Sequence, residues 1–192
     1  MTVLSQHTSD VNSGRAFASL ERRFPSWEAV LHAPADEVAD AIRSGGIANI
    51  KARRIQSILA QVEAREGAVD LRRLEQLGDE EVDEYLRSLP GVGRKTAACV
   101  LLFSLGRAAF PVDTHVHRVA ARLGLVPPRS TADAAHDLLA PRVPPEIQYE
   151  LHVQLIRHGR EICKPRAPRC SHCVLFDLCP AGARFMASGE AR

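Results

Sequence analysis

The chain has 192 residues, 45% of them hydrophobic, so it can bury a core as one large domain or two small ones. Its formal net charge of +2 neither requires nor excludes a polyanionic partner. The first residues, MTVLSQHTSD, lack the charged flank and apolar run of a secretion signal, and no stretch reaches the roughly 20 apolar residues that cross a bilayer. We therefore expect a cytoplasmic globular protein that does not contact a membrane.

Apolar residues recur at helical spacing along the chain, and glycine or proline separates the segments. No run shows the alternation of a β-strand, so the pattern predicts an all-α protein. In chain order, helices are expected at residues 10–24, 35–43, 51–66, 80–88, 94–106, 114–123, 131–139 and 145–162. The interior of the fifth, TAACVLLFSL, is apolar on nearly all sides, which is typical of a helix buried among others.

A glycine turn joins the fourth and fifth expected helices in LPGVGRKTA, residues 89–97. Gly91 and Gly93 allow a sharp turn and leave N–H groups beside a helix N-terminus, whose partial positive charge suits a phosphate. The segment PGVG alone is more typical of a plain helix connection. The residues after it favour contact with a nucleic-acid backbone, in which Arg94 would take part.

Eighteen residues beyond Lys95, Asp113 precedes an expected amphipathic helix in PVDTHVHRVAARLGL. Taken alone, Asp113 would most simply be the N-cap of that helix, accepting backbone N–H bonds from its first turn.

Four of the five cysteines lie in CKPRAPRCSHCVLFDLCP, residues 163–180. A reducing compartment and an odd cysteine count argue against disulfides and favour a metal site. Structural zinc sites generally show two closely spaced pairs, whereas this segment has a single C-x₂-C; an iron–sulfur cluster held by cysteines is the alternative. Cys99, in the apolar helix, is interpreted as an inert core residue.

Taken together, the hairpin, the lysine, VDTHVHR and the four cysteines resemble the helix-hairpin-helix base-excision DNA glycosylases, and within them the endonuclease III family. The resemblance runs from LSQHTSD to the last cysteine. It implies a helix-hairpin-helix DNA glycosylase fold with two helical lobes and DNA bound between them. The first lobe would cover residues 1–106, with the hairpin motif at about 80–105, and the second residues 107–192, with the cluster loop at 163–179.

The family's cysteine pattern has six, two and five residues between successive ligands, and this sequence matches it without a gap. The resemblance therefore implies a [4Fe–4S] cluster. Its four ligands would be Cys163, Cys170, Cys173 and Cys179. The family uses the loop between the first two to contact the DNA backbone, although its charges could instead be solvated and offset the thiolates. Three basic residues lie on it: Lys164, Arg166 and Arg169.

Family members with a lysine at the position of Lys95 are implied to attack the sugar C1′ and form a Schiff base. An amine attacks only when neutral, and a helix N-terminus beside Arg94 favours the neutral form. Asp113 would stabilise positive charge that develops on the sugar and help to deprotonate the nucleophile. Elimination of the 3′ phosphate would then cut the strand.

Two loops of the family fill the hole that a flipped base leaves, and both occur here in altered form. Aligned on Asp10, His7 falls where the family usually has glutamine, with Gln6 one place earlier. In GGIANIKA, Ile47 replaces the usual leucine. These departures leave lesion preference open.

The resemblance predicts a bifunctional DNA glycosylase and abasic-site lyase of base excision repair. We expect a monomer that acts on double-stranded DNA with oxidised pyrimidines or abasic sites, associated with the nucleoid when bound. A mismatch-directed glycosylase would normally lack the lysine, and a non-catalytic hairpin module would need neither Lys95 nor Asp113. A zinc nucleobase deaminase would need H-x-E and P-C-x-x-C, neither of which occurs.

Overall fold

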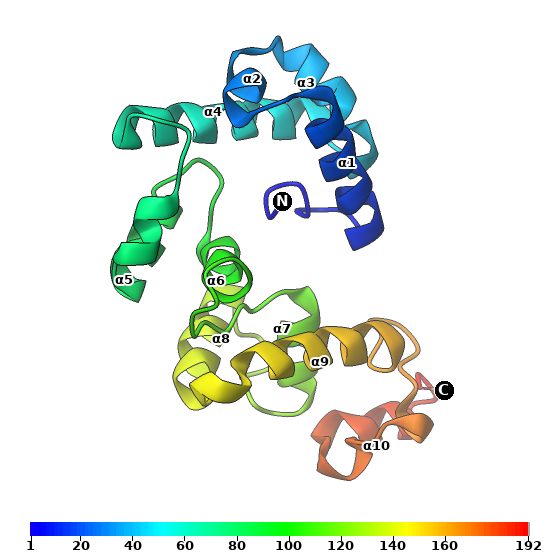
Figure 1. Cartoon of the computed structure of the whole chain (residues 1–192). Helices are drawn as coiled ribbons and strands as arrows, with labels where there is room; N and C mark the ends of the chain where they lie inside the picture. Colours follow the sequence, from blue (N-terminus) through cyan, green and yellow to red (C-terminus); the bar gives the residue numbers. More distant parts are fainter. Residues whose placement is uncertain (192) are drawn as a thin grey trace. The chain divides into compact units, whose positions relative to one another are not determined.

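The computed structural model describes residues 1–191. Within them the chain forms ten α-helices and six short 3-10 helices and no β-strand, which confirms the all-α prediction (Figure 1). Backbone contacts divide the chain into two compact units, Met1–Val100 and Leu101–Arg192. Each unit buries a hydrophobic core of its own.

The first unit is built around one long helix. Its helices are α1 (Asp10–Arg23), α2 (Trp27–His32), α3 (Ala35–Ala41), α4 (Ala48–Glu66), α5 (Asp79–Arg87) and most of α6 (Arg94–Phe103), with η1 (Arg43–Gly45) and η2 (Arg72–Gln76) between them. The 19-residue α4 packs along α2 and α3, while α1 packs on α3 and η1. Ser9 and Ser26 cap α1 and α2 by accepting the N–H groups of Asn12 and Ala29.

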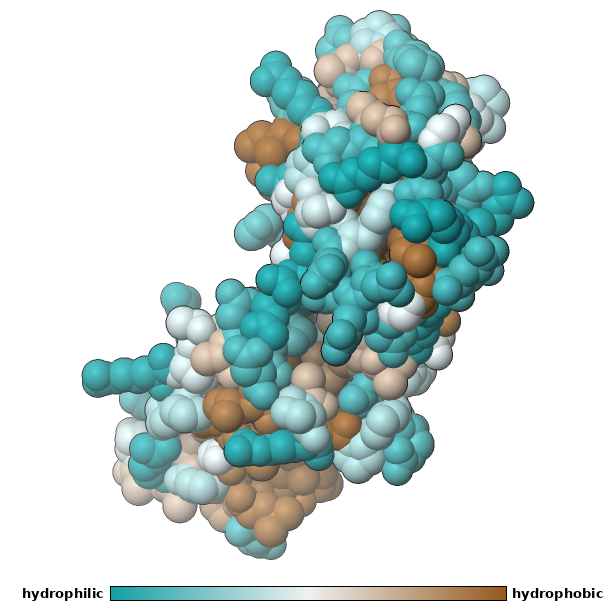
Figure 2. All heavy atoms as spheres, turned by 90° about the vertical axis from the view of Figure 1, so that its left-hand side faces the viewer, coloured by the Kyte–Doolittle hydropathy of each residue, from teal (hydrophilic) through white to brown (hydrophobic). Residues whose placement is uncertain are grey.

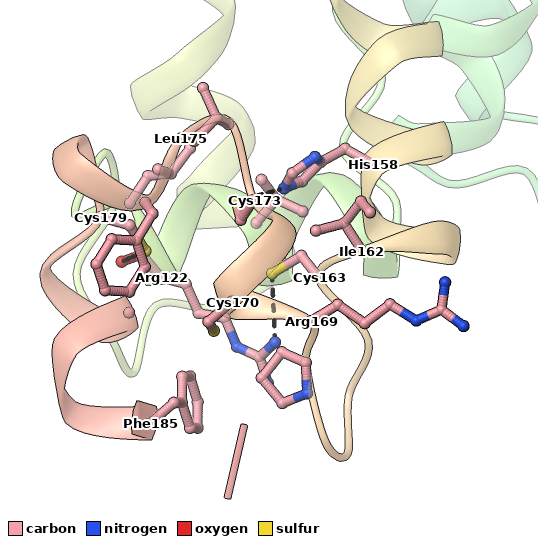
Figure 3. Close-up of a pocket in the computed structure, with 15 residues that line it drawn as sticks. Arg122, His158, Ile162, Cys163, Arg169, Cys170, Cys173, Leu175, Cys179 and Phe185 are labelled. Atoms are coloured by element: carbon pink, nitrogen blue, oxygen red, sulfur yellow. Dashed lines mark hydrogen bonds between the residues drawn. The ribbon is translucent and has the colours of Figure 1, made fainter. Parts of the chain in front are cut away.

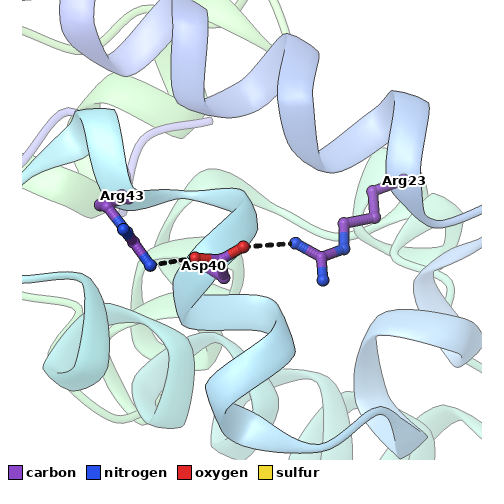
Figure 4. Close-up of polar contacts among 3 residues, drawn as sticks. All are labelled: Arg23, Asp40 and Arg43. Carbon is purple, nitrogen blue, oxygen red and sulfur yellow. Dashed lines mark hydrogen bonds and ion pairs between the residues drawn. The ribbon is translucent and has the colours of Figure 1, made fainter.

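An ion-pair network on Asp40 of α3 joins α1, α3 and η1 at the surface (Figure 4). Arg23, in the last turn of α1, donates from Nη1 to Oδ2 of Asp40 at 2.9 Å, and Arg43 pairs with Oδ1. The hydrogen bond from Arg23, followed by the charge of Arg43, lowers the pKa of the Asp40 carboxyl.

The second unit centres on two closely packed helices. Its helices are α7 (Thr114–Arg122), α8 (Ala132–Leu139), α9 (Gln148–Glu161) and α10 (Pro180–Ala187), with η3 (Ala140–Arg142), η4 (Pro145–Ile147), η5 (Cys170–His172) and η6 (Phe176–Leu178). Helices α7 and α9 pack along each other, and α10 packs on α7 and the two 3-10 turns of the cysteine segment. Glycine is needed at Gly159 of α9, because a Cβ there would lie 2.9 Å from Cβ of His115.

The boundaries of four helices differ from the sequence-based expectation by two or three residues. Helix α3 ends at Ala41 and not at residue 43, and α9 begins at Gln148 and not at residue 145, after the 3-10 turn η4. Helix α6 ends at Phe103 and not at residue 106, because Gly106 takes a left-handed φ of 64° and Arg107 N–H bonds back to Leu101 O. Helix α4 begins at Ala48, three residues earlier than expected, with Ile47 as its N-cap. The short helices α2 and α10 are not among the expected helices.

The face drawn in Figure 2 is mostly hydrophilic, and its hydrophobic side chains form separate patches. None of the helices in residues 1–191 combines the length and the hydrophobicity that a membrane span requires.

Candidate functional site

The glycine turn between α5 and α6 is held in place from two sides. Leu89 and Val92 are buried, and Val92 N–H donates to Leu89 O at 3.1 Å, which closes the turn. Gly91 has a left-handed φ of 70°, and a Cβ there would lie 2.4 Å from Nε of Arg54 on α4. The left-handed backbone therefore favours glycine at position 91, and the flexible Arg54 side chain that lies against it would have to move to admit a larger residue.

Lys95 lies half-buried in the first turn of α6. The N–H groups of Thr96 and Ala97 both donate to Gly93 O at 3.0 Å, so the helical bonding begins at this glycine. The first N–H groups of a helix have no acceptor within it and carry its partial positive charge. Gly93, Arg94 and Lys95 thus form a helix N-terminus that is suited to an anion.

The chain has only three lysines, and their surroundings differ sharply. Lys51 has 0% of its surface exposed. Lys95 and Lys164 are half-buried, the first at the hairpin and the second in the cysteine segment. An amine that must reach a DNA sugar therefore has two lysine candidates, of which Lys95 stands at the helix N-terminus.

Asp113 is the N-cap of α7, as the simpler interpretation of its sequence position predicted. Its Oδ1 accepts the N–H groups of His115 at 2.9 Å and Val116 at 2.8 Å. Because both bonds use one oxygen, the cap does not require the second oxygen of the half-buried carboxylate.

Two buried histidines bind the backbone that leads into Asp113. Val112 N–H donates to Nε2 of His136 on α8 at 2.9 Å, and Nδ1 of His152 on α9 lies 2.9 Å from Pro111 O. The side chains of Phe110 and Val112 are buried as well. The position of Asp113 is therefore fixed by backbone contacts to two other helices, which sequence reasoning missed because each histidine is at least 24 residues away.

Gln6 and His7, in the loop before α1, have different surroundings. His7 is exposed and takes a left-handed φ of 54°. Gln6 turns the other way: its Nε2 donates to Gly91 O at 3.1 Å and Thr96 Oγ1 at 3.3 Å, and its Oε1 accepts from Arg54 at 2.7 Å. The structure thus places Gln6 against the hairpin and His7 in solvent.

The loop before α4 presents an exposed aliphatic side chain on a strained backbone. Ile47 is 48% exposed and has φ of 42° and ψ of 41°, a left-handed conformation that is unusual for a β-branched residue. Such conformations persist only where the surrounding structure holds them, and they concentrate at functional sites.

The four cysteines of the C-terminal segment line a single pocket (Figure 3). Among residues 1–191 no three His, Cys, Asp or Glu side chains are grouped closely enough to hold one metal ion. The four cysteines instead line the pocket without meeting at a single position. Burial raises the pKa of the Cys170 thiol, and the nearby Cys163, Cys173 and Cys179 raise it further. Burial also raises the pKa of Cys173. A cationic metal group would relieve the cost of ionising these thiols together, so the residues fit such a group.

Two arginines of α7 hold the first part of the cysteine segment. Arg118 donates from Nε to Cys163 O at 2.9 Å. Arg122 donates to Lys164 O at 2.7 Å and to Pro165 O at 3.0 Å. Arg122 also donates to Sγ of Cys163 at 3.3 Å, a bond that is drawn in Figure 3. Sequence reasoning missed both arginines, since nothing local distinguishes them from solvated charges.

The basic residues of this segment differ in exposure. Arg166 and Arg169 are exposed and Lys164 is half-buried, and Figure 3 shows Arg169 extending away from the cysteines. The bonds from Arg122 hold the backbone at Lys164 and Pro165, while the exposed charges of Arg166 and Arg169 remain available to an anion.

Comparisons with known proteins identify the family and the fold of the chain. The family model described as "HhH-GPD superfamily base excision DNA repair protein" matches residues 1–145. Endonuclease III of Thermotoga maritima is 34% identical over 195 residues, covering 100% of this chain and 84% of that protein. An Arabidopsis thaliana protein named as a DNA glycosylase is 40% identical over 185 residues, covering 93% of this chain.

The chain spans 62% of that Arabidopsis protein and about a tenth of two rice proteins, ROS1C and ROS1A. Among solved structures, a non-covalent endonuclease III–DNA complex has a TM-score of 0.85 at 32% identity, over 96% of this chain and 82% of the other. A trapped endonuclease III–DNA covalent intermediate has a TM-score of 0.84 at 32% identity, with the same coverage.

Proposed function

Because the chain belongs to the HhH-GPD superfamily of base excision DNA repair proteins, we propose that it is a bifunctional DNA glycosylase and abasic-site lyase. One observation carries the proposal: Lys95 is the lysine that stands at the N-terminus of the helix after the glycine hairpin. A relative of the same fold has been trapped as a covalent intermediate with DNA, which supports a nucleophile on the protein.

In the proposed reaction the neutral amine of Lys95 forms a bond to C1′ of the sugar as the bond from C1′ to the base breaks. The base leaves with the electron pair and takes up a proton. The C1′–O4′ bond of the adduct then breaks as the lysine nitrogen loses a proton and O4′ gains one, which opens the sugar ring and leaves a Schiff base at C1′. The protonated Schiff base acidifies the neighbouring C2′ position, so loss of a proton there expels the 3′ phosphate and cuts the strand. Hydrolysis of the Schiff base returns Lys95 to the free amine.

Asp113 supplies negative charge for the positively charged sugar that develops as the base leaves. Its Oδ1 is committed to the cap of α7, so we assign this role to the second oxygen. The contacts from His136 and His152 keep the carboxylate in place before the substrate arrives, which lowers the reorganisation cost of the step.

The hairpin and the two exposed loops would bind the DNA around the reacting nucleotide. Backbone N–H groups near Gly91, Gly93 and Arg94 would bind phosphate. The exposed side chains of His7 and Ile47 would enter the base stack where the nucleotide has left it, as wedging side chains do in other DNA-bending proteins.

We propose that Cys163, Cys170, Cys173 and Cys179 hold a [4Fe–4S] cluster. When bound, the cluster would supply four iron–thiolate bonds that fix both ends of the basic loop, and it would take no part in the steps above. Lys164, Arg166 and Arg169 would then contact phosphates and position the protein without reading sequence.

A strand-cleavage assay tests the proposed function. Duplexes carrying an abasic site, a thymine glycol or a mismatch are incubated with wild-type protein, with Lys95→Gln and with Lys164→Gln. We expect the wild type to cleave at the abasic site and the oxidised pyrimidine, Lys164→Gln to bind less tightly but still cleave, and Lys95→Gln to bind without cleaving. Cleavage by Lys95→Gln at the wild-type rate would refute the assignment.

A further inference from the structure

The reaction leaves one unusual residue without a role. Lys51 of α4 is fully buried, and its ammonium donates to two backbone carbonyls, Leu4 O at 2.7 Å and Gly45 O at 2.8 Å. A buried charge is costly unless it is hydrogen-bonded, and here both acceptors are neutral. Arg54, one turn later, carries like charge. An apolar side chain of similar length would fill the same space without the cost of burying a charge.

The two carbonyls belong to the two loops whose tips carry strained residues. Leu4 lies three residues before His7, and Gly45 lies two residues before Ile47. Both tips take left-handed φ values, 54° and 42°, although neither residue is glycine. Each such conformation costs about 1–3 kcal/mol, so something must hold it.

The first loop is bound to α4 at a second point. Arg54 donates to Oε1 of Gln6 at 2.7 Å, and Gln6 in turn donates to Gly91 O of the hairpin. Lys51 and Arg54 of α4 thus hydrogen-bond to the two loops, and Gln6 continues this connection to the hairpin. Lys51 is the residue that joins the two loops to each other.

We propose that Lys51 is a positioning residue whose ammonium fixes the loops of His7 and Ile47 as one unit, so that both side chains enter the DNA stack together. The proposal rests on the proposed function, because it assigns the two tips to the hole left by a flipped nucleotide. Lys51 would act through backbone that it holds and would touch neither DNA nor the reacting atoms.

The test compares two abasic substrates in single-turnover cleavage. One is a duplex in which a base faces the abasic site, so that a hole must be filled. In the other the facing nucleotide is omitted and the abasic site is bulged, so that no base has to be held apart. Lys51→Met keeps the apolar chain and removes the ammonium.

We expect Lys51→Met to cleave the fully paired duplex at least tenfold more slowly and the bulged duplex within twofold of wild type. Arg53→Met is the matched control, because Arg53 is an exposed arginine on the same helix, and it should leave the ratio of the two rates unchanged. Fluorescence of 2-aminopurine placed opposite the abasic site should show weaker unstacking for Lys51→Met.

If Lys51→Met does not fold, Gly45→Ala replaces it. A Cβ at Gly45 would lie 3.3 Å from Cβ of Ala16 on α1, which is a tight contact, and at ordinary van der Waals distances of 3.9 Å from Nζ of Lys51 and 4.0 Å from Leu4 O, so it presses on the second loop beside the Lys51 contact without removing the charge. It should change the rate ratio in the same direction by a smaller factor. An equal loss on both substrates, or no loss on either, overturns the inference; a wild type that cleaves neither substrate refutes the proposed function instead.

Discussion

Arg122 of α7 donates from Nη1 to Sγ of Cys163 at 3.3 Å, and the same guanidinium donates to the carbonyls of Lys164 and Pro165. It also lies over the Phe185 ring of α10, 4.7 Å from the ring centroid. One side chain therefore connects a cysteine of the pocket, the start of the basic loop and the last helix. This makes the cysteine pocket and the basic loop one mechanical unit.

Replacing Arg122 with glutamine should loosen the basic loop. The change removes charge-assisted bonds worth about 1.5–3 kcal/mol each before relaxation, so we expect a lower free energy of unfolding and weaker, less salt-dependent DNA binding. Urea denaturation and binding at several salt concentrations measure both effects. Arg157→Gln breaks only the exposed pair with Glu161 and should change neither by more than a fraction of that amount.

The purified protein should contain iron and inorganic sulfide. Cys173→Ser should lose most of both, while Cys99→Ala, which alters a buried cysteine outside the pocket, should keep them. Removing iron from the wild type with a chelator should weaken DNA binding, because the ends of the basic loop are then released. Stoichiometric zinc without iron would contradict the [4Fe–4S] assignment.

Two substitutions at Asp113 distinguish the stability that it contributes as an N-cap from the rate effect of its negative charge. Asn caps as well as Asp, so Asp113→Asn should keep the free energy of unfolding within about 0.5 kcal/mol, whereas Asp113→Ala should lose roughly 0.5–2 kcal/mol. Both should slow base release on the order of a hundredfold, the size expected for one lost electrostatic contact in the transition state. Thermal denaturation and single-turnover rates measure the pair. Normal rates in Asp113→Asn would leave Asp113 as a cap alone.

Burial gives Lys51 a pH signature that its methionine variant should lack. Burial lowers the pKa of Lys51, and the charge of Arg54 lowers it further. Between the lowered pKa of the folded state and the higher pKa of the unfolded chain, the unfolded chain binds more protons, so the free energy of unfolding rises with pH across that window. The wild type should therefore gain stability relative to Lys51→Met as pH approaches lysine's ordinary pKa of about 10.4. A difference that stays constant from neutral pH upward would contradict this.

Local sequence was sufficient to predict the helices that have clear periodicity and the motifs whose residues are neighbours in the chain. The boundaries of α1, α5 and α7 agree with expectation within one residue, because Ser9 and Asp113 cap α1 and α7 and acidic residues fill the first turn of α5. The hairpin could also be recognised, since its glycines are adjacent in sequence.

Contacts between distant residues could not be predicted in this way. The carbonyl of Leu4 that Lys51 binds lies 47 residues away, and a lysine on a helix is usually solvated, so nothing indicated that this one is buried. Arg122 reaches Cys163 across 41 residues for the same reason. Ile47 was recognised by its place in a loop, but its left-handed backbone depends on packing that the sequence does not display.

Covalent trapping tests directly whether Lys95 is the nucleophile. Borohydride is added during reaction of the wild type with an abasic duplex, and the protein–DNA adduct is digested and mapped by mass spectrometry. Since Lys51 is buried, the mapping has to distinguish Lys95 from Lys164, and Lys164→Gln serves as the matched control. We predict an adduct at Lys95 that persists in Lys164→Gln and disappears in Lys95→Gln, with DNA binding by Lys95→Gln largely retained. An adduct mapped to another residue, or one that forms undiminished in Lys95→Gln, would contradict the account.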